Sequence, residues 1–447
     1  MNRTPHILII TLFLLALPAC SGTSQPAAPV AAQPAAPGAA QPATAVAKSP
    51  HESWPSEFFL ARPEGAKGRA IAYDMADGSQ RFSLPNGMLA ADHTAYYAAS
   101  VTPKPQLDVS AAKQSVPAFD LNTRLDAYDP QTGELVRSFD FDGAWELSGV
   151  APSGRWLALT RSPSAEEQQE RQETGQWQTK VNIVQAEEGR VVNALVLDGN
   201  FEVETISADG SALFLVQHLP AVKPDHYLIR LYDLAAERLQ EDPLRDKQLI
   251  DEVMSGYAWD GLASPNGQWL LTLYLSTNRE VAFIHTLDLW NKAPTCIDLP
   301  SGDGDIELLK YYTLALDPNS QTVYAANTAL GVIAEVSLHQ RKLVRATRFD
   351  AQAPLPTDAH LQATSSRSVT SPDGRTLYFS NGTNVWAYDT KERAVSGPYQ
   401  ADGQITGLGV SSDGKRLYVA QSDQLLVFDT ASGEVLKDFD TRIGVMQ

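Results

Sequence analysis

The sequence predicts an all-β fold built from a repeated four-stranded unit, and two observations carry that prediction. Residues 371–380 (SPDGRTLYFS) return as residues 411–420 (SSDGKRLYVA). Each phrase is followed by a strand-like run that ends in Asp-Thr, residues 384–390 (NVWAYDT) and 424–430 (QLLVFDT). A unit that repeats along a chain indicates an array of similar supersecondary elements, which specifies architecture better than chemistry.

The N-terminal 51 residues are expected to lie outside the fold. The apolar run 7–17 is shorter than the roughly 20 residues of a membrane-spanning helix, so residues 1–19 are interpreted as a signal peptide. Residues 17–20 (LPAC) resemble the lipobox of bacterial lipoproteins, which implies a diacylated Cys20; an ordinary secretory signal is the alternative. Residues 20–51, rich in Ala and Pro, are expected to form a disordered tether.

Residues 52–447 are long enough to form a substantial core, and their partners are constrained by charge. The formal net charge of the chain is −18, so nucleic acid is excluded as a partner and any membrane link should come from acyl chains alone. Cys20 and Cys296 are the two cysteines. A lipidated Cys20 leaves no intrachain disulfide, and Cys296 is expected to be a buried, inert thiol. We expect a monomer.

Each unit is expected to run through four strands in a fixed order. The first strand ends in a tight turn, the second is aromatic and β-branched, the third ends in a polar residue, usually Asp, before a second turn, and the fourth leads away. The first turns are expected at residues 92–94, 153–154, 209–210, 266–267, 319–320, 373–374 and 413–414. The third strands are expected at residues 125–129, 181–185, 229–233, 283–288, 332–337, 385–389 and 425–429.

Seven such units predict a seven-bladed β-propeller of four-stranded antiparallel blades, because closing the ring protects the strand edges. The spacing is about 54 residues per unit, longer than the roughly 40 of a compact repeat, so the excess is expected in loops. Residues 71–74 (IAYD) look like another third strand. Whether they clasp the last blade or belong to an eighth, incomplete blade stays open.

The second strands carry a resemblance to a known family. Residues 323–327 (VYAAN), 377–381 (LYFSN) and 417–421 (LYVAQ) are similar to the repeat motif of the YVTN family of β-propellers. The likeness is close in the last three units and looser in the others. Membership would imply the propeller fold but no single activity, because relatives include binding modules, lactonase-like enzymes and amine-dehydrogenase-like subunits.

The long connections are all expected on one rim of the propeller. Those between second and third strands are 101–122, 161–179 and 218–226, and those between units are 241–256, 300–310 and 350–366. Loops on a rigid scaffold commonly carry binding, so this rim is predicted to be the working face. Residues 164–173 are very polar and are expected to form a short exposed helix or a mobile loop.

The beginnings of the first strands should meet at the mouth of the central channel on the same rim. Carboxylates that converge there would suit a cation, so a divalent cation is left open while no cofactor is predicted. Thr406 has an equivalent place. The candidate ligand-binding residues are Glu146, Glu202, Glu204, Asp260, Tyr312 and Arg367.

No catalytic motif accompanies these residues. The sequence lacks His-Glu-x-x-His, Gly-x-Ser-x-Gly, a phosphate-binding Gly-rich loop before Lys, and Cys-x-x-Cys-His. We therefore expect a bacterial, lipid-anchored, extracytoplasmic binding or scaffold module that holds a protein or peptide on its loop-rich rim. A lactonase-like hydrolase with a metal or water at the channel mouth is the alternative, and an oxidoreductase subunit whose cofactor lies on another chain is a weaker third reading.

Overall fold

A computed structural model describes residues 58–61, 69–74, 79–103, 121–246, 256–276, 280–301, 306–350, 366–421 and 423–440. The predicted signal peptide, Cys20 and the tether lie outside the described residues, as do large parts of the predicted loops around residues 110, 250 and 360.

The described strands form eight antiparallel sheets, seven with four strands and one with three. The three-stranded sheet contains β1 (Phe58–Ala61), β2 (Ala70–Asp74) and β3 (Gln80–Leu84). The next two sheets contain β4 (Met88–Leu89), β5 (Tyr96–Pro103), β6 (Leu121–Tyr128) and β7 (Leu135–Asp142), then β8 (Trp145–Val150), β9 (Trp156–Arg161), β10 (Gln178–Gln185) and β11 (Arg190–Asp198). They are followed by β12 (Asn200–Ile206), β13 (Ala212–Leu219), β14 (His226–Asp233) and β15 (Arg238–Leu239), then β16 (Tyr257–Ala263), β17 (Trp269–Ser276), β18 (Val281–Asp288) and β19 (Ala293–Asp298).

The last three sheets are those in which the sequence repeat is clearest. They contain β20 (Tyr312–Leu316), β21 (Thr322–Asn327), β22 (Val332–Ser337) and β23 (Lys342–Arg348); β24 (Arg367–Thr370), β25 (Thr376–Asn381), β26 (Asn384–Asp389) and β27 (Ala394–Gln400); and β28 (Ile405–Val410), β29 (Arg416–Gln421), β30 (Gln424–Asp429) and β31 (Val435–Asp440). The helices are α1 (Ala165–Thr174) and α2 (Ile306–Leu309).

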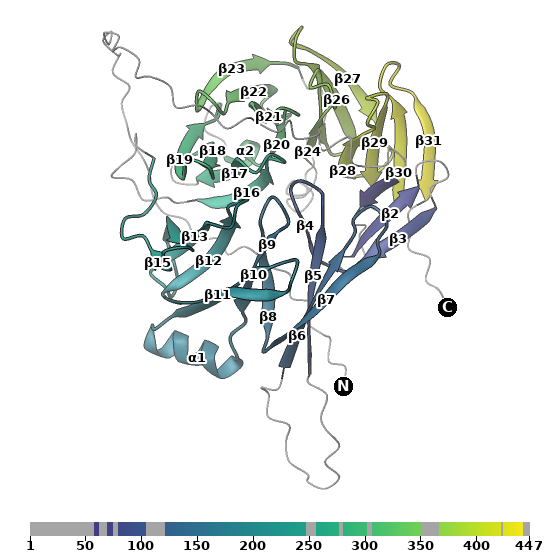
Figure 1. Cartoon of the computed structure of the whole chain (residues 1–447). Helices are drawn as coiled ribbons and strands as arrows, with labels where there is room; N and C mark the ends of the chain where they lie inside the picture. The colour runs from purple at the N-terminus through teal and green to yellow at the C-terminus, as the bar shows by residue number, and fades with distance from the viewer. Residues whose placement is uncertain are drawn as a thin grey trace, which may run out of the picture.

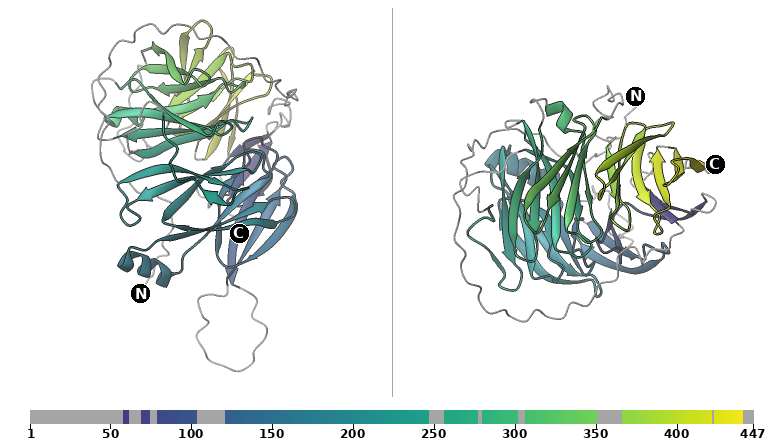
Figure 2. Two further views of the ribbon diagram at one scale, coloured as in Figure 1. Left: turned by 60° about the vertical axis from the view of Figure 1, so that its left-hand side comes forward. Right: turned by 90° about the horizontal axis from the view of Figure 1, so that it is seen from above.

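The sheets follow one another in chain order around a ring, as Figure 1 shows from one side and Figure 2 from two others. In each four-stranded sheet, or blade, consecutive strands are neighbours. We call the strands of a blade A to D in chain order. The predicted third strands and first turns fall in the C strands and A–B turns of the seven blades, so that part of the prediction is confirmed.

The count of seven blades is incomplete, because the three-stranded sheet occupies an eighth place in the ring (Figure 1). Ile71 and Tyr73 of β2 lie in a buried cluster with side chains of β29, β30 and β31. On the other side, Ala70 and Leu84 share a cluster with Tyr96 of β5. The sheet therefore lies between the last and the first blade and closes the ring by side-chain packing.

Turn hydrogen bonds identify which strands this sheet contains. The Asp74 N–H donates to the Ser79 carbonyl at 2.8 Å, as Asp429 N–H does to Glu434 at 2.9 Å in the C–D turn of the last blade. β2 and β3 thus correspond to strands C and D, and β1 to strand B. Among the described strands, none occupies the inner position of this sheet.

The A–B turns owe their shape to a Ser-x-Asp-Gly or Ser-x-Asn-Gly sequence in four of the blades. In one of them, Ser371 Oγ donates to Asp373 Oδ1 at 2.6 Å and accepts from the Thr376 N–H at 2.8 Å. Gly374 has φ +70°, a value that an L side chain adopts with strain. The same pattern of bonds occurs in the turns that begin at Ser207, Ser264 and Ser411.

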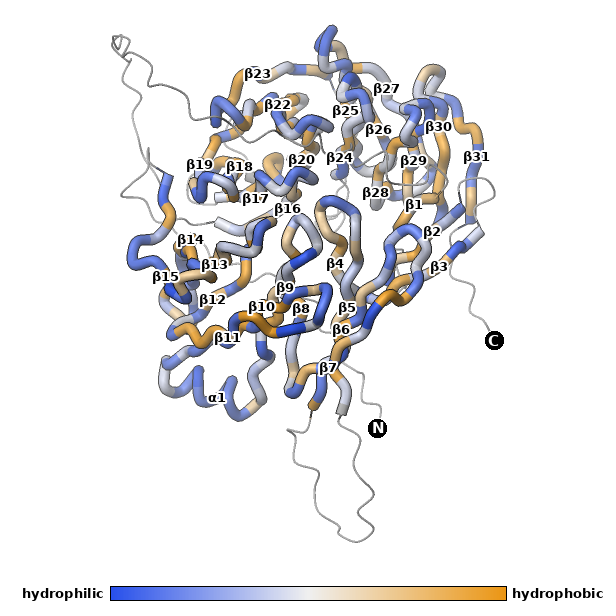
Figure 3. Tube along the Cα trace, viewed as in Figure 1, coloured by the Kyte–Doolittle hydropathy of each residue, from blue (hydrophilic) through white to orange (hydrophobic). Residues whose placement is uncertain are grey.

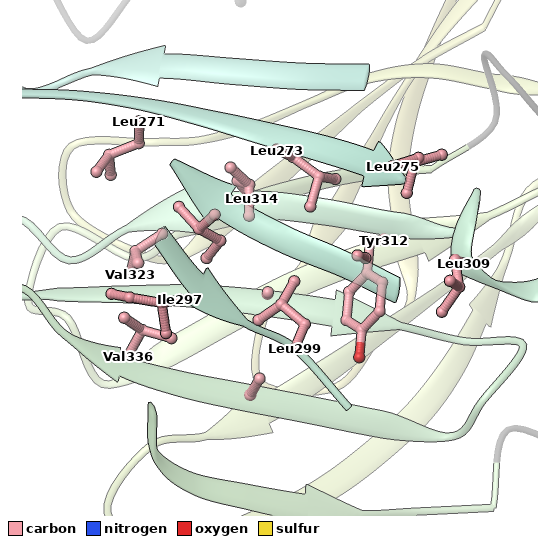
Figure 4. Packing of buried hydrophobic residues seen from close by; sticks show 14 of the residues in the cluster. Leu271, Leu273, Leu275, Ile297, Leu299, Leu309, Tyr312, Leu314, Val323 and Val336 are labelled. Carbon is pink, nitrogen blue, oxygen red and sulfur yellow. The ribbon is translucent and has the colours of Figure 1, made fainter. Parts of the chain in front are cut away.

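Hydrophobic packing between neighbouring blades forms the core. Figure 4 shows one such layer, in which Leu271, Leu273 and Leu275 of β17 face Leu314 of β20 and Val323 of β21. The period-two alternation of each strand supplies apolar side chains to both faces, so every blade is sandwiched by its neighbours. Trp269 at the start of β17 is 4% exposed and belongs to the same buried cluster.

Both helices lie in connections at one rim. α1 lies between the B and C strands of its blade and α2 between two blades, where the sequence predicted long loops. The connection predicted at 218–226 is shorter, because β13 continues to Leu219 and β14 begins at His226. Within the described part of the chain, neither helix is long and apolar enough to cross a membrane.

Candidate functional site

The inner A strands are irregular at the level where the sequence placed the channel mouth. Pairing with the B strand skips one residue in four of them, which is the mark of a β-bulge. A bulge re-aims the side chain of the extra residue, so the simple alternation of faces does not hold there. The extra residues are Ser148, Glu204, Trp259 and Thr406.

The bulge in β12 brings two predicted carboxylates into one polar cluster. Glu202 is 59% exposed and its Oε2 lies 3.1 Å from Nε2 of His218 on β13. Glu204 is half-buried and accepts a hydrogen bond from Thr272 on β17 of the next blade. Tyr274, also on β17, stacks on Tyr227 of β14 with 5.6 Å between ring centroids. The cluster thus lies at the boundary between two blades, and we call it the Glu204 cluster.

Burial and neighbouring charge change the acidity of this cluster. Removal from water raises the pKa of Glu204 from 4.5 to about 7, and the negative charge of Glu202 adds to the effect. Burial likewise raises the pKa of Tyr274 and of Tyr227 above their usual range, with Glu204 contributing to both. Glu204 therefore changes charge near neutral pH, unlike an ordinary surface glutamate.

Asp260 and Arg367 bind backbone of the neighbouring blades. Asp260 Oδ2 accepts the N–H of Leu314 at 3.0 Å, which ties β16 to β20. Arg367 donates from Nε to the Thr406 carbonyl at 3.0 Å, which ties β24 to β28, and from Nη1 to the carbonyl of Ser366 at 2.7 Å. Both side chains hold inner strands together, a role that the sequence reading did not assign to them.

The other predicted channel residues are placed differently from one another. Glu146 Oε1 accepts from Ser162 Oγ at 2.6 Å near the start of the α1 connection. Tyr312 is 1% exposed, packs in the layer of Figure 4 and donates its hydroxyl to the Pro300 carbonyl at 2.6 Å. Tyr312 is thus a core residue, and its predicted place at the channel mouth is wrong because the aromatic side chain lies between two blades.

No metal centre emerges from these groups. Within the described ranges, no set of three His, Cys, Asp or Glu side chains is arranged to hold a metal ion. Cys296 is half-buried rather than buried, and its Sγ lies 3.7 Å from Nδ1 of His285. Burial lowers the pKa of His285 to about 4, so the imidazole is neutral at physiological pH.

A hollow on the same rim lies against α1. Its volume is about 560 Å³, which is in the range of small-molecule and side-chain pockets. Trp177 and Lys180 line it together with α1 residues between Glu167 and Thr174. Arg171 lies 4.8 Å from the centre of the Trp177 ring. The helix buries none of its side chains and is hydrophilic along its length (Figure 3). Of the two alternatives that the sequence left open for residues 164–173, a short exposed helix or a mobile loop, the structure has the helix.

Sequence reasoning found Glu202 and Glu204 but missed the groups around them. The predicted site residues did not include His218, Thr272, Tyr227 or Tyr274. Their proximity depends on how two blades face each other, and a local pattern does not encode that. A strand position with two carboxylates two residues apart was the one available signal.

Comparison with known proteins identifies the fold of this chain but does not assign the chain to a family. No protein-family model matches the chain, and no curated protein sequence matches it. Among solved structures, dihydro-heme d1 dehydrogenase NirN in complex with DHE is similar with a TM-score of 0.51 and 13% identity, over 90% of this chain and 76% of that one. Porphyromonas gingivalis dipeptidyl peptidase 4 gives a TM-score of 0.51 and 10% identity.

This chain has a β-propeller fold. The similarity to the dipeptidyl peptidase structure covers 87% of this chain but only 59% of the dipeptidyl peptidase chain. The structure of the Dos1 propeller is a further match, with a TM-score of 0.41, 10% identity and coverage of 67% of this chain and 73% of that one. At these identities the likeness concerns the fold alone, and the activities named for those proteins are theirs.

Proposed function

We propose that this protein is a binding or scaffold module that uses its loop-rich rim to hold a protein or peptide. The observation that supports this most directly is the difference between the two rims. α1, α2, the 560 Å³ hollow and the exposed carboxylate of Glu202 all belong to the rim of the B–C and D–A connections. Four of the seven A–B turns on the other rim repeat one short hydrogen-bonded pattern, which leaves little variation for recognition there.

A binding role also agrees with how the channel residues are used. Asp260 and Arg367 are committed to neighbouring backbone, and Glu146 to Ser162. A catalytic constellation needs a nucleophile or base beside groups that stabilise developing charge. Rigid blades with variable loops provide a broad surface for a partner without such a constellation.

The binding role is tested by changing one rim at a time. In the full chain, residues 165–174 are replaced by a short Gly-Ser linker that joins the same ends of β9 and β10. The control changes the opposite rim, with Lys391→Gln and Glu392→Gln in the C–D turn between β26 and β27. Quantitative co-purification from the source cells should lose its specific partners with the first variant and keep them with the second. Retention of every partner by the first variant would contradict the proposal.

A hydrolase of lactonase type is the second candidate, and Glu204 is the observation that favours it. A carboxyl group with a pKa near 7 suits a general base at neutral pH. Glu204→Gln should then remove turnover of a simple lactone while the protein stays folded, with a melting temperature no lower than that of the wild type. Turnover that persists in this variant would eliminate Glu204 as the base.

We also propose that Cys20 carries a lipid and anchors the propeller outside the cytoplasm of a bacterial cell. The support is the likeness of residues 17–20 to a lipobox and the Ala- and Pro-rich stretch that follows. Cys20→Ser should move the protein from the membrane fraction to the soluble fraction after cell breakage. An unchanged distribution would argue against the lipid anchor.

A further inference from the structure

We propose that the hollow against α1 is a binding site for a neutral saccharide, with Trp177 as the surface on which a pyranose ring stacks. We call this cavity the α1 hollow. The inference goes beyond the proposed protein-binding function, since it adds a small-molecule ligand class to the same rim. Its basis is a cavity of about 560 Å³ in which a half-buried tryptophan lies among hydrogen-bond donors and acceptors.

The charges around the α1 hollow disfavour a charged ligand. Three lining side chains are carboxylates, those of Glu167, Glu170 and Asp198, and two are cations, those of Arg171 and Lys180. An anionic ligand would be repelled by the carboxylates, and a cationic ligand by the guanidinium and ammonium groups. A neutral ligand avoids both repulsions.

The polar groups of the hollow suit a ligand that donates and accepts hydrogen bonds at the same atoms. The carboxylates accept, Lys180 donates, and the side-chain amides of Gln176 and Gln178 can do both. A hydroxyl group also does both, because it has one O–H donor and two lone pairs. A pyranose carries several hydroxyls on one rigid ring, a higher density than the single N–H and C=O of each peptide residue.

Trp177 supplies the apolar surface that a sugar ring needs. Its side chain is half-buried, and the part that stays accessible borders the hollow. Arg171 lies 4.8 Å from the centre of the indole ring, so the ring already has one positively charged neighbour. The face of an aromatic ring carries partial negative charge, so it also attracts the weakly positive C–H groups on one side of a pyranose.

The lining groups are held in place by bonds to one another. Arg171 donates from Nη2 to the Gln178 carbonyl at 2.7 Å, and Gln178 Nε2 donates to Asp198 Oδ1 at 3.3 Å. The Trp177 carbonyl accepts from the Gly199 N–H at 2.6 Å. A site formed in advance loses little conformational freedom on binding, and this offsets the weakness of each single contact to a sugar.

The hollow is open to solvent beside the C-terminus of α1. A Cβ atom placed on Gly175, the residue that caps the helix, would meet no atom within 4 Å. The adjacent Gln176 is exposed, and α1 buries none of its side chains. A sugar can therefore reach Trp177 from this side without a movement of the blades.

The test measures saccharide binding by the full chain, with a matched tryptophan control. Cellotriose, maltotriose, mannotriose and N-acetylchitotriose are titrated into the protein by calorimetry, and at least one should bind saturably. Trp177→Ala should weaken that binding at least about tenfold, whereas Trp177→Phe should keep part of it because an aromatic face remains. Trp290→Ala should leave it unchanged, since Trp290 is 59% exposed in the turn between β18 and β19 on the opposite rim.

Ionic strength supplies a second readout, which separates a neutral ligand from a charged one. The affinity for the saccharide should change less than about twofold between about 0.05 and 0.5 M NaCl, because the complex contains no ion pair with the ligand. Capped triaspartate and trilysine peptides serve as charged probes and should bind more weakly than the saccharide.

Three results would overturn the saccharide site. These are the absence of saturable binding of all four trisaccharides, equal loss in Trp177→Ala and Trp290→Ala, and tighter binding of either charged peptide with loss in Trp177→Ala, which would assign a peptide site instead. If no saccharide binds while co-purification still depends on residues 165–174, the rim function stands and only the saccharide site is wrong. If a saccharide binds while co-purification does not depend on these residues, the reverse holds.

Discussion

The two rims of this propeller are made from the same strands but follow different rules. Four of the seven A–B turns share one structure, in which a Ser hydroxyl and an Asp or Asn side chain bind the backbone of the turn, as at Ser371 and Ser411. The other rim has a capped helix, a hollow beside that helix, and inner strands of which four carry a bulge. We call the rim of the A–B and C–D turns the repeated rim, and the loop-rich rim of the B–C and D–A connections the irregular rim. The comparison indicates that shared turn bonds stabilise the repeated rim, whereas the loops of the irregular rim differ from blade to blade.

The largest loss of stability is expected from a substitution at Asp288, which lies in a C–D turn of the repeated rim. This carboxylate is 1% exposed and accepts from the Asn291 N–H at 3.1 Å and from Arg341 Nη2 of the next blade at 3.0 Å. Asp288→Ala should lower the free energy of unfolding by about 3 kcal/mol, because it leaves buried donors and a guanidinium without their acceptor. Urea denaturation measures the change. A loss below about 1 kcal/mol would show that this rim carries less of the stability than claimed.

A smaller loss is expected in the A–B turn of the β24–β27 blade. Ser371→Ala removes the acceptor of the Thr376 N–H and the donor to Asp373, and should cost about 1.5 kcal/mol. Combined with Asp373→Ala, the loss should be less than the sum of the two single losses, because the two side chains act together. Additive losses in a double-mutant cycle would mean that the turn is not a unit.

The third prediction concerns the irregular rim and pH. The folded-state pKa of Glu204, about 7, lies above the ordinary value of 4.5, so the folded protein binds an extra proton between these values. Its contribution to stability is therefore lost as pH rises from about 4.5 to about 7, by an amount on the order of 1 kcal/mol. Glu204→Gln should gain stability relative to wild type over this range in urea denaturation. A constant difference from pH 5 to pH 8 would contradict the raised pKa.

The smallest global effect is expected at the cap of α1. Ser164 Oγ accepts a hydrogen bond from the Glu167 N–H at 3.1 Å, and Glu167 Oε2 accepts one from the Ser164 N–H at 2.8 Å. Ser164→Ala should destabilise this helix locally by about 1 kcal/mol without moving the melting temperature, because α1 buries no side chain. Faster hydrogen exchange confined to residues 165–174 would confirm it, and a drop in melting temperature would mean that α1 supports the fold.

The repeated rim is also the part that sequence reading predicted best. Turn residues such as Asp373 and Gly374 act through their own backbone, so their pattern is local and visible in the chain. The place of the three-stranded sheet was left open, because the strand-like run at residues 71–74 could clasp the last blade or belong to an eighth, incomplete blade. Its place became clear only from packing against β5 and β30, which are distant in the sequence.

The channel mouth was predicted only in outline for a related reason. The sequence predicted equivalent positions for the A-strand residues, but Tyr312 turns into the core. Bulges in the inner strands alter the alternation that the prediction assumed. The hydrogen bond from the Leu314 N–H to Asp260 depends on how two neighbouring blades are aligned, and the sequence of one strand does not specify that alignment.

The central claim is that partners meet the irregular rim, and site-specific photocrosslinking tests it most directly. A photoreactive residue is placed at Gln176, which is exposed beside the α1 hollow, or at Lys391, which is exposed on the repeated rim. Irradiation of intact source cells should give a discrete adduct from position 176 and none from position 391. Adducts of equal yield from both positions, or an adduct from position 391 alone, would contradict the assignment of the working face.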